Sequence, residues 1–292
     1  MVQEQKNVSV KLKLSQAIRS FSIDKQDLRK LCNILQERST AAGVIELEKY
    51  KKGGGQSEEG YEKDKKLMEE AFELKITISG SNGAELYGTI DEVFDSPNFP
   101  DKINSFYVNS ESTLRGVYNW YPRNSFDLLL DFTKLKVFDF SLMPSQFTPN
   151  NSTFRVQGYE ATWANGVFHE ITNFINEKKA ILSLVHNHSI YDILVWILGL
   201  PLAFWACGKT SKLIESFSVF NVFIRNAIYV YIFFAMLLIF RILFHYLRWI
   251  TPLVEFKYKN SKVILHRCIF GAILLAVLSS VVYDILKALF GH

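Results

Sequence analysis

Two histidines stand where the chain becomes strongly apolar, in the stretch LVHNHSIYDILVWILGLPLAFWACGKTSK at residues 184–212. Imidazoles bind metals, but His186 and His188 are two residues apart, so on a helix they would lie on different faces. A shared metal would need an extended segment, and Asp192 is the nearest further ligand. We therefore keep His186 and His188 as weak metal candidates and favour polar residues at the lipid headgroups, with Ser189 capping a membrane helix.

The same stretch lacks the spacing of a phosphate-binding loop. The pattern GxxxxGK[ST] requires a glycine five residues before Gly208, and that position holds Ala203. The three cysteines, Cys32, Cys207 and Cys268, show no CxxC spacing, which argues against a zinc site or a disulfide framework. The sequence therefore assigns no cofactor.

Aromatic and arginine side chains alternate in the stretch LRGVYNWYPRNSF, residues 114–126. The cluster consists of Arg115, Tyr118, Trp120, Tyr121 and Arg123. Aromatic rings stack on bases and guanidinium groups pair with phosphates, so this composition suits a small nucleotide ligand. The competing interpretation is that these aromatic residues pack across strands of a sheet.

Groups that could catalyse a reaction are few. The carboxylates of TIDEVFDS, Asp91, Glu92 and Asp95, lack the spacing and the glycine of a calcium loop and suit a solvated turn. No nucleophile–base pair or paired-carboxylate spacing stands out, so we favour a protein that is not an enzyme. The alternative is a membrane-anchored hydrolase that uses His169, Glu170, His186 or His188.

Charge divides the chain into two parts. Residues 1–188 carry 23 basic and 25 acidic side chains, whereas residues 189–292 carry ten basic and four acidic ones. The formal net charge of +4 therefore belongs to the loops of an apolar tail and not to a basic surface spread over the molecule. This distribution argues against nucleic-acid binding by the first part.

The apolar tail contains three segments close to the roughly 20 residues that cross a bilayer. They lie near residues 190–207, 225–245 and 268–286. Charged side chains fall near their ends, at the membrane polar positions Asp192, Arg225, Arg241 and Asp284. We expect three spans, of which the first is kinked at Gly199 and Pro201. The alternative is a re-entrant or interfacial first segment with two true spans.

The basic loops predict the orientation of these spans. Five of the tail's basic residues, Arg248, Lys257, Lys259, Lys262 and Arg267, lie in the loop at residues 246–267, which should face the cytoplasm. The N-terminus lacks a secretory signal and is expected in the cytosol. We therefore predict an integral protein of the plasma or inner membrane, with the C-terminus outside if there are three spans.

Residues 1–188 are predicted to form one cytosolic α+β domain, an antiparallel sheet of five to seven strands with flanking helices. Helical spacing occurs at residues 22–38 and 159–179, and VIELEKYK (residues 44–51) suits a strand or a continued helix. A glycine- and charge-rich stretch at 51–66 is expected to be a flexible loop. Strand patterns occur at residues 7–14, 72–80, 84–94, 103–110, 125–132, 135–142 and 152–159.

These features lead to two main hypotheses. The first is a cytosolic recognition domain tethered to an all-α membrane module of about three helices, acting as a sensor, adaptor or complex subunit. The second is an oligomeric pore-forming or gated effector controlled by the cytosolic domain, with small residues of the third segment allowing helices to approach. The expected partners are the lipid bilayer and either further copies of the chain or a different protein.

Overall fold

The computed structural model describes residues 10–135, 137, 148–179, 183–217, 221–258 and 261–290 of the 292-residue chain. The chain forms two compact units. Unit 1 comprises Met1–Thr133, Pro149–Ser183 and Leu253–Tyr258, and unit 2 comprises Lys134–Thr148, Leu184–Pro252 and Lys259–His292. The sequence predicts a single domain boundary after residue 188. In the structure, the earlier segment Lys134–Thr148 belongs to unit 2, and the later segment Leu253–Tyr258 belongs to unit 1.

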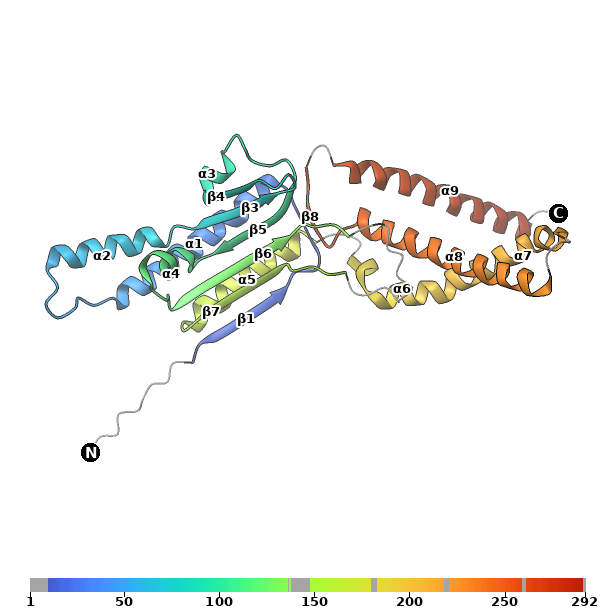
Figure 1. The fold of residues 1–292 in the computed structure, drawn as a ribbon. Coiled ribbons are helices and arrows are strands. Elements are labelled where there is room, and N and C mark those ends of the chain that lie inside the picture. The colour runs from blue at the N-terminus through green and yellow to red at the C-terminus, as the bar shows by residue number, and fades with distance from the viewer. Residues whose placement is uncertain are drawn as a thin grey trace, which may run out of the picture. The chain divides into compact units, whose positions relative to one another are not determined.

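Unit 1 is built on a six-stranded antiparallel sheet in the order β1-β7-β6-β5-β3-β4, which confirms the predicted sheet (Figure 1). Its strands are β1 (Leu12–Ala17), β3 (Lys75–Gly80), β4 (Glu85–Thr89), β5 (Ile103–Asn109), β6 (Asn124–Asp131) and β7 (Thr153–Gly158). The pattern at 84–94 ends as a strand at Thr89 and continues as helix α3 (Ile90–Phe94). The strand pattern at 135–142 lies largely outside the described residues.

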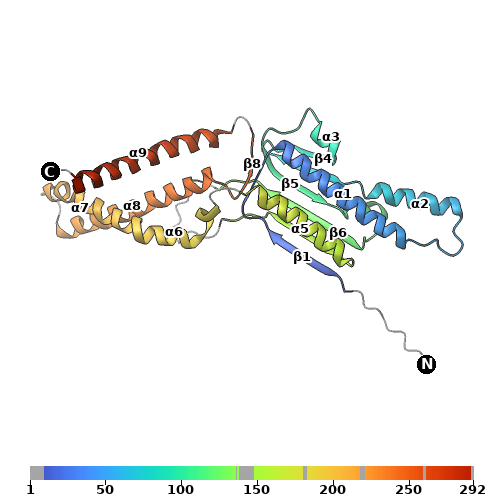
Figure 2. The ribbon, with the colours of Figure 1, turned by 180° about the vertical axis from the view of Figure 1, so that it is seen from behind.

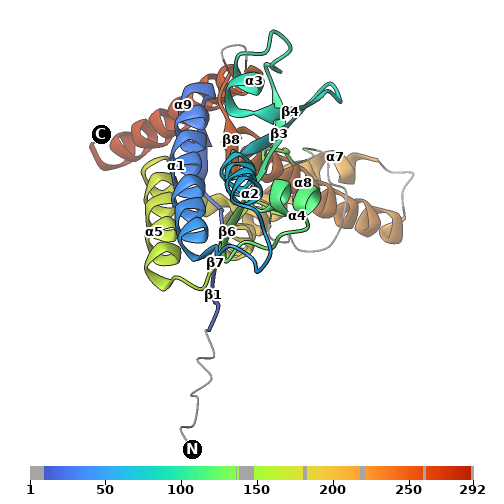
Figure 3. The same ribbon diagram turned by 90° about the vertical axis from the view of Figure 1, so that its left-hand side faces the viewer.

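One face of the sheet is covered by the helices α1 (Lys25–Lys49) and α5 (Ala161–Glu177) (Figures 2 and 3). Strand residues alternate between faces, so every second residue of β3 and β6 points to these helices. Leu128 of β6 is fully buried there with Leu31 of α1 and Ile171 of α5, at the centre of one hydrophobic core. The other face carries partly exposed polar side chains such as Thr77 and Tyr107.

The amphipathic helix expected after Ser22 is α1, and its N-cap is Asp24, whose side chain accepts a hydrogen bond from the backbone of Asp27. It continues through the ambiguous segment VIELEKYK to Lys49. Gly43 allows α1 to approach Phe72, since a Cβ added at Gly43 would lie 2.9 Å from that ring.

The flexible loop predicted at residues 51–66 is shorter than expected, because α2 (Glu58–Ala71) begins within it. Ser57 caps this helix by accepting a hydrogen bond from the backbone of Gly60. Strand β5 is followed by α4 (Ser112–Tyr118), whose C-cap Asn119 has a left-handed backbone.

A second, two-stranded sheet in unit 1 pairs β2 (Phe21–Ile23) with β8 (Val254–Phe256) in parallel. The pairing joins residues 233 positions apart, and the sequence patterns do not anticipate it. In Figure 1 the label β8 marks this strand between α8 (Val222–Ile250) and α9 (Lys262–Phe290) along the chain.

The remaining elements are helical. After η1 (Ser183–His186), the chain forms α6 (His188–Leu194), the π-helical turn η2 (Val195–Gly199) and α7 (Leu200–Ser216), followed by α8 and α9. Two continuous helices, Ser189–Ser216 and Val222–Ile250, are long and apolar enough to cross a membrane. Only 22% and 11% of the residues in their most apolar windows are buried, whereas a helix in a soluble core would be mostly buried. The third span, expected within α9, remains a prediction.

Where the sequence predicts a kink at Gly199 and Pro201, the structure has the π-helical turn η2, which ends two residues before Pro201. Proline has no N–H to continue the helical hydrogen bonds, and a wider turn absorbs the mismatch. Gly199 also brings the first apolar helix against α8, because a Cβ added there would lie 3.3 Å from the ring of Phe240. The two apolar helices therefore pack as a hairpin.

Candidate functional site

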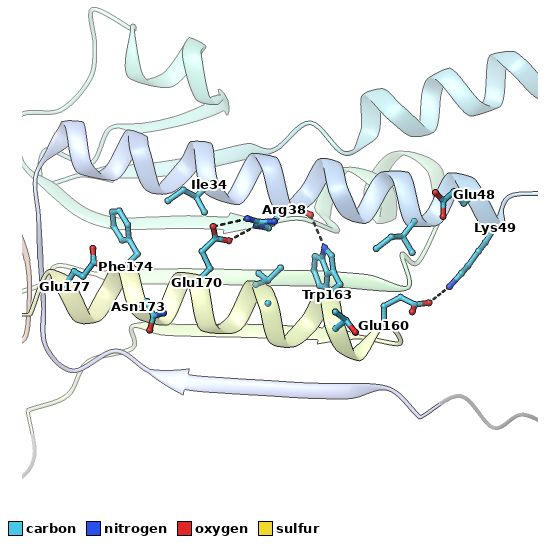
Figure 4. A pocket seen from close by; sticks show the side chains of 14 residues that line it. Ile34, Arg38, Glu48, Lys49, Glu160, Trp163, Glu170, Asn173, Phe174 and Glu177 are labelled. Atoms are coloured by element: carbon cyan, nitrogen blue, oxygen red, sulfur yellow. Dashed lines mark hydrogen bonds and ion pairs between the residues drawn. The ribbon is translucent and has the colours of Figure 1, made fainter.

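A groove of about 990 Å³ lies between α1 and α5 on the surface of unit 1 (Figure 4). The two helices run antiparallel, since the end of α1 contacts the start of α5 through the ion pair of Lys49 with Glu160. The groove is lined by Ile34, Arg38, Ile45, Glu48, Lys49, Glu160, Thr162, Trp163, Gly166, Val167, Glu170, Asn173, Phe174 and Glu177.

Helical periodicity produces the groove. On α5, Ala164, Val167 and Ile171 recur every three to four residues and face the sheet. Trp163 and Glu170 lie seven residues apart, two turns of helix, on the side that meets α1. The sequence thus gives α5 a buried apolar face and a mixed face beside it, and α1 has the same arrangement.

An ion pair crosses the middle of the groove (Figure 4). Nε and one terminal nitrogen of Arg38 donate to the two carboxylate oxygens of Glu170, at 2.6 and 2.9 Å. This bidentate contact raises the pKa of Arg38. The indole nitrogen of Trp163 donates to the backbone oxygen of Arg38 at 3.2 Å. Glu170, a candidate residue of the hydrolase alternative, has its ion-pair partner 132 residues away on α1.

The groove contains more acidic than basic side chains. Glu48, Glu160, Glu170 and Glu177 line it against two cations. Hydrogen bonding to Lys49 lowers the pKa of Glu160, so this carboxylate is ionised at neutral pH. Within the described residues, Glu48 and Glu177 are exposed and form no ion pair. These two lie toward opposite ends of the groove (Figure 4).

The predicted nucleotide-type cluster is divided between two environments. Arg115 pairs with Glu111 at 2.8 Å and its guanidinium carbon lies 5.0 Å from the centre of the exposed Tyr121 ring. Tyr118 is exposed on the same short helix, α4.

The other two members of the cluster point to different neighbours. The ring of Trp120 meets Tyr50 edge-on at 6.0 Å, and the guanidinium of Arg123 lies over Tyr159 at 5.1 Å. The backbone nitrogen of Arg123 donates to the buried carboxylate of Glu46. Packing therefore accounts for these two side chains, and ligand binding at the five residues stays a prediction.

His186 is buried and both of its ring nitrogens have protein partners. Nδ1 lies 2.8 Å from the hydroxyl of Thr148, and Nε2 contacts the backbone oxygen of Thr251. The backbone carbonyl can only accept, so Nε2 carries a proton, and in the neutral ring Nδ1 accepts from the hydroxyl of Thr148. Burial lowers the pKa of His186 below its ordinary value.

The residues that follow His186 form the start of the first apolar helix. Asn187, not Ser189, caps this helix, accepting a hydrogen bond from the backbone of Ser189 at 3.2 Å. The side chain of His188 lies outside the described part of the structure. No group of three or more metal-ligating side chains occurs among the described residues.

Three basic residues are buried along one side of α8: Arg241, His245 and Arg248. Arg248 donates to the backbone oxygens of Val185 and Asn187, at 2.9 and 3.4 Å, and so fixes the turn that precedes the first apolar helix. Arg241, one of the predicted membrane polar positions, is only 6% exposed.

The other three predicted membrane polar positions differ in their contacts and burial. Arg225 donates to the backbone oxygen of Phe217 at 3.3 Å and Asp192 is half-buried. Asp284 belongs to α9, and its side chain lies outside the described residues.

Strand β8 is one of the elements that the sequence patterns do not predict. The backbone nitrogen of Phe21 donates to Leu253 at 2.9 Å, and that of Lys257 donates to Ile23 at 2.7 Å. Val254 is 1% exposed, and the ring of Phe256 packs edge-on against Phe132 at 5.8 Å. Within the connection between α8 and α9, Leu253, Val254 and Phe256 are therefore part of the core of unit 1.

The α1–α5 groove presents apolar surface, paired ions and two exposed carboxylates, and β8, which lies between α8 and α9 in the sequence, pairs with β2 in unit 1. No protein-family model matches the chain, and comparisons with curated proteins and with solved structures also gave no match.

Proposed function

We propose that the protein is a membrane-anchored recognition protein, acting as a sensor, adaptor or complex subunit. Unit 1 is the recognition part, and the two apolar helices are its anchor. The observation that carries this proposal is strand β8, which lies in sequence between α8 and α9 yet pairs with β2 in the core of unit 1.

The pairing supports a definite number of crossings. Ser183 and Leu253 both belong to unit 1, so the chain between them must begin and end on the same side of a membrane. Crossing by both Ser189–Ser216 and Val222–Ile250 meets this condition. A re-entrant first helix followed by a crossing α8 would put β8 on the side opposite β2. The β2–β8 pair therefore favours a hairpin of two full crossings.

The charge of the loops then sets the orientation. Residues 246–267 contain five basic side chains and one acidic side chain, and such loops remain in the cytoplasm. Unit 1 shares that side with β8, so the recognition domain is cytosolic. If α9 also crosses, the C-terminus lies outside.

The short connection between α8 and β8 would couple movements of unit 1 to the end of α8. Helix α8 ends at Ile250 and β8 begins at Val254, so three residues separate a membrane helix from a buried strand. Movement of β8 with the core around β2 would be passed to the end of α8 through these three residues of the chain. This link supports a role in which binding at unit 1 alters the membrane helices or their neighbours.

The test is labelling by a membrane-impermeant maleimide in intact cells, with Cys207 and Cys268 replaced by serine. Phe217→Cys, in the turn between the two apolar helices, should be labelled from outside. Lys66→Cys in unit 1 and Lys257→Cys after β8 are both exposed and should be labelled only after permeabilisation. Labelling of positions 66 and 257 from opposite sides would refute the proposed topology.

A further inference from the structure

We propose that the α1–α5 groove binds a cationic amphipathic helix of a partner protein. The inference rests on the proposed function, because it names the class of partner that unit 1 recognises. Amphipathic helices commonly dock with their apolar face in a groove between secondary-structure elements. Here the partner would lie along α1 and α5 as a third helix.

The shape of the groove suits a helix of limited length. The α1 residues that line it run from Ile34 to Lys49, which corresponds to about 22 Å of helix. A docked helix of about 15 residues would have the same length. Gly166 has no heavy atom within 4 Å of an added Cβ, so α5 leaves room at the middle of the groove for an approaching backbone.

The apolar part of the groove is divided in two by the ion pair. Ile34 and Phe174 lie on one side of the Arg38–Glu170 contact, and Trp163 lies on the other (Figure 4). Ile45 also lines the groove and follows Arg38 by seven residues, two turns further along α1. Ile34 and Ile45 are eleven residues apart, which is about three turns of helix. The partner should therefore place large apolar residues eleven positions apart, with small or polar residues between them opposite the ion pair.

Charge selects a cationic partner. Arg38 and Lys49 are already paired with Glu170 and Glu160, whereas Glu48 and Glu177 form no ion pair within the described residues. Basic residues near both ends of the docked helix would meet these carboxylates. Exposed ion pairs contribute little affinity, so the apolar contacts supply binding and the charges supply specificity and a faster association.

An anionic partner fits this surface poorly. It would bring like charges against Glu48 and Glu177, and a neutral apolar helix would desolvate both carboxylates without pairing them. Acidic side chains outnumber basic ones in residues 1–188, and this charge also disfavours an anionic partner at longer range.

The test uses the full chain in nanodiscs of zwitterionic phosphatidylcholine. The probes are two fluorescent helical peptides of about 15 residues with leucines eleven positions apart. One peptide has lysines at both ends and the other has glutamates at the same positions. Fluorescence anisotropy measures binding, and empty nanodiscs report binding to lipid. We expect the lysine peptide to bind about tenfold tighter than the glutamate peptide, and its affinity to fall with added salt.

Variants locate the binding site. Glu48→Lys with Glu177→Lys should weaken binding of the lysine peptide about tenfold. The matched control, Glu62→Lys with Glu70→Lys on exposed positions of α2, makes the same change in net charge and should leave binding intact. Gly166→Leu should also weaken binding, because the added side chain enters the groove while a leucine favours the helix over glycine.

The outcomes separate this inference from the proposed function. Equal affinity for the two peptides, no binding above empty nanodiscs, or no effect of Gly166→Leu would overturn the groove proposal and leave the maleimide result standing. If Glu48→Lys with Glu177→Lys instead dissociates a homo-oligomer, the occupant is a second copy of the chain and the partner proposed here is wrong. Unit 1 outside the cell would refute the proposed function even if the lysine peptide bound.

Discussion

At the scale of single residues, His186 shows how burial changes the role of a candidate ligand. The sequence leaves it open to a metal or to the headgroups, whereas the structure places it between Thr148 and the backbone oxygen of Thr251. Its hydrogen-bond partners are 38 and 65 residues away in the sequence. The spacing of residues around His186 therefore could not predict its role.

This burial predicts a pH dependence of stability. The pKa of folded His186 is below its ordinary value of 6.5, so the unfolded chain binds the proton first as the pH falls. The stabilisation is complete above the unfolded pKa and is lost as the pH falls through the folded pKa. Melting temperatures of the full chain in detergent should fall between pH 7 and pH 5, less steeply for His186→Gln. The exposed His169→Gln is the control, and equal slopes for His186→Gln and wild type would contradict the prediction.

At Gly43 we expect substitution by alanine to destabilise the protein, the opposite of its usual effect inside a helix. Replacing a glycine inside a helix by alanine usually stabilises it by about 1 kcal/mol. At Gly43 the added Cβ would lie 2.9 Å from the ring of Phe72, so we expect Gly43→Ala to lower the melting temperature. Gly166→Ala in α5 meets no neighbour and should raise it. A rise in both variants would show that Phe72 moves aside at little cost.

At the scale of elements, local patterns predicted the elements that are long enough to show a periodic pattern. Alternation identified β3, β5, β6 and β7, and helical spacing identified α1 and α5. Helix α2 was missed because its charged composition resembles a linker, although Glu and Lys also form helices well. Its stability depends on tertiary contacts, such as the stacking of Tyr61 on Tyr50 at 5.4 Å.

Strand β8 and the groove were missed for a related reason. A three-residue parallel strand gives no periodic signal, and its partner β2 is equally short. For the groove, Trp163 was visible as part of a helical pattern and Glu170 as a polar residue beside it. The groove exists only when α5 is placed antiparallel to α1, which brings Arg38 to Glu170.

Strand β8 should matter to the stability of unit 1 although it lies outside the N-terminal part of the sequence. Phe256 is 7% exposed and packs with Phe132, so Phe256→Ala should destabilise unit 1 by about 3 kcal/mol. Hydrogen exchange of the β6 amides in the full chain would report this loss. The control Val117→Ala, at a position 68% exposed, should have little effect. Unchanged exchange in Phe256→Ala would show that β8 is not part of the core.

At the scale of the whole molecule, the anchored recognition protein and the pore-forming effector differ in assembly. Two or three helices per chain are too few for a monomeric pore, so the effector must form a homo-oligomer. We expect light scattering of the purified full chain in mild detergent to give a single copy or a complex with a different protein. A discrete homo-oligomer would instead favour the effector and justify conductance measurements.

The central claim is that β8, the segment between α8 and α9, is a strand of the cytosolic domain. It is tested most directly by cross-linking Ser22→Cys with Glu255→Cys in native membranes, with Cys207 and Cys268 replaced by serine. These positions are register partners in β2 and β8, and neighbouring strands lie about 4.8 Å apart, within reach of a disulfide.

Mass spectrometry after mild oxidation should find the linked peptides, as it should for the sheet control Thr77→Cys with Tyr107→Cys, partners in β3 and β5. Ser22→Cys with Lys66→Cys, which are not register partners, should give no cross-link. Formation of the 22–255 disulfide would support the β2–β8 pair in the membrane-bound protein. Its absence while the 77–107 control forms would contradict the claim.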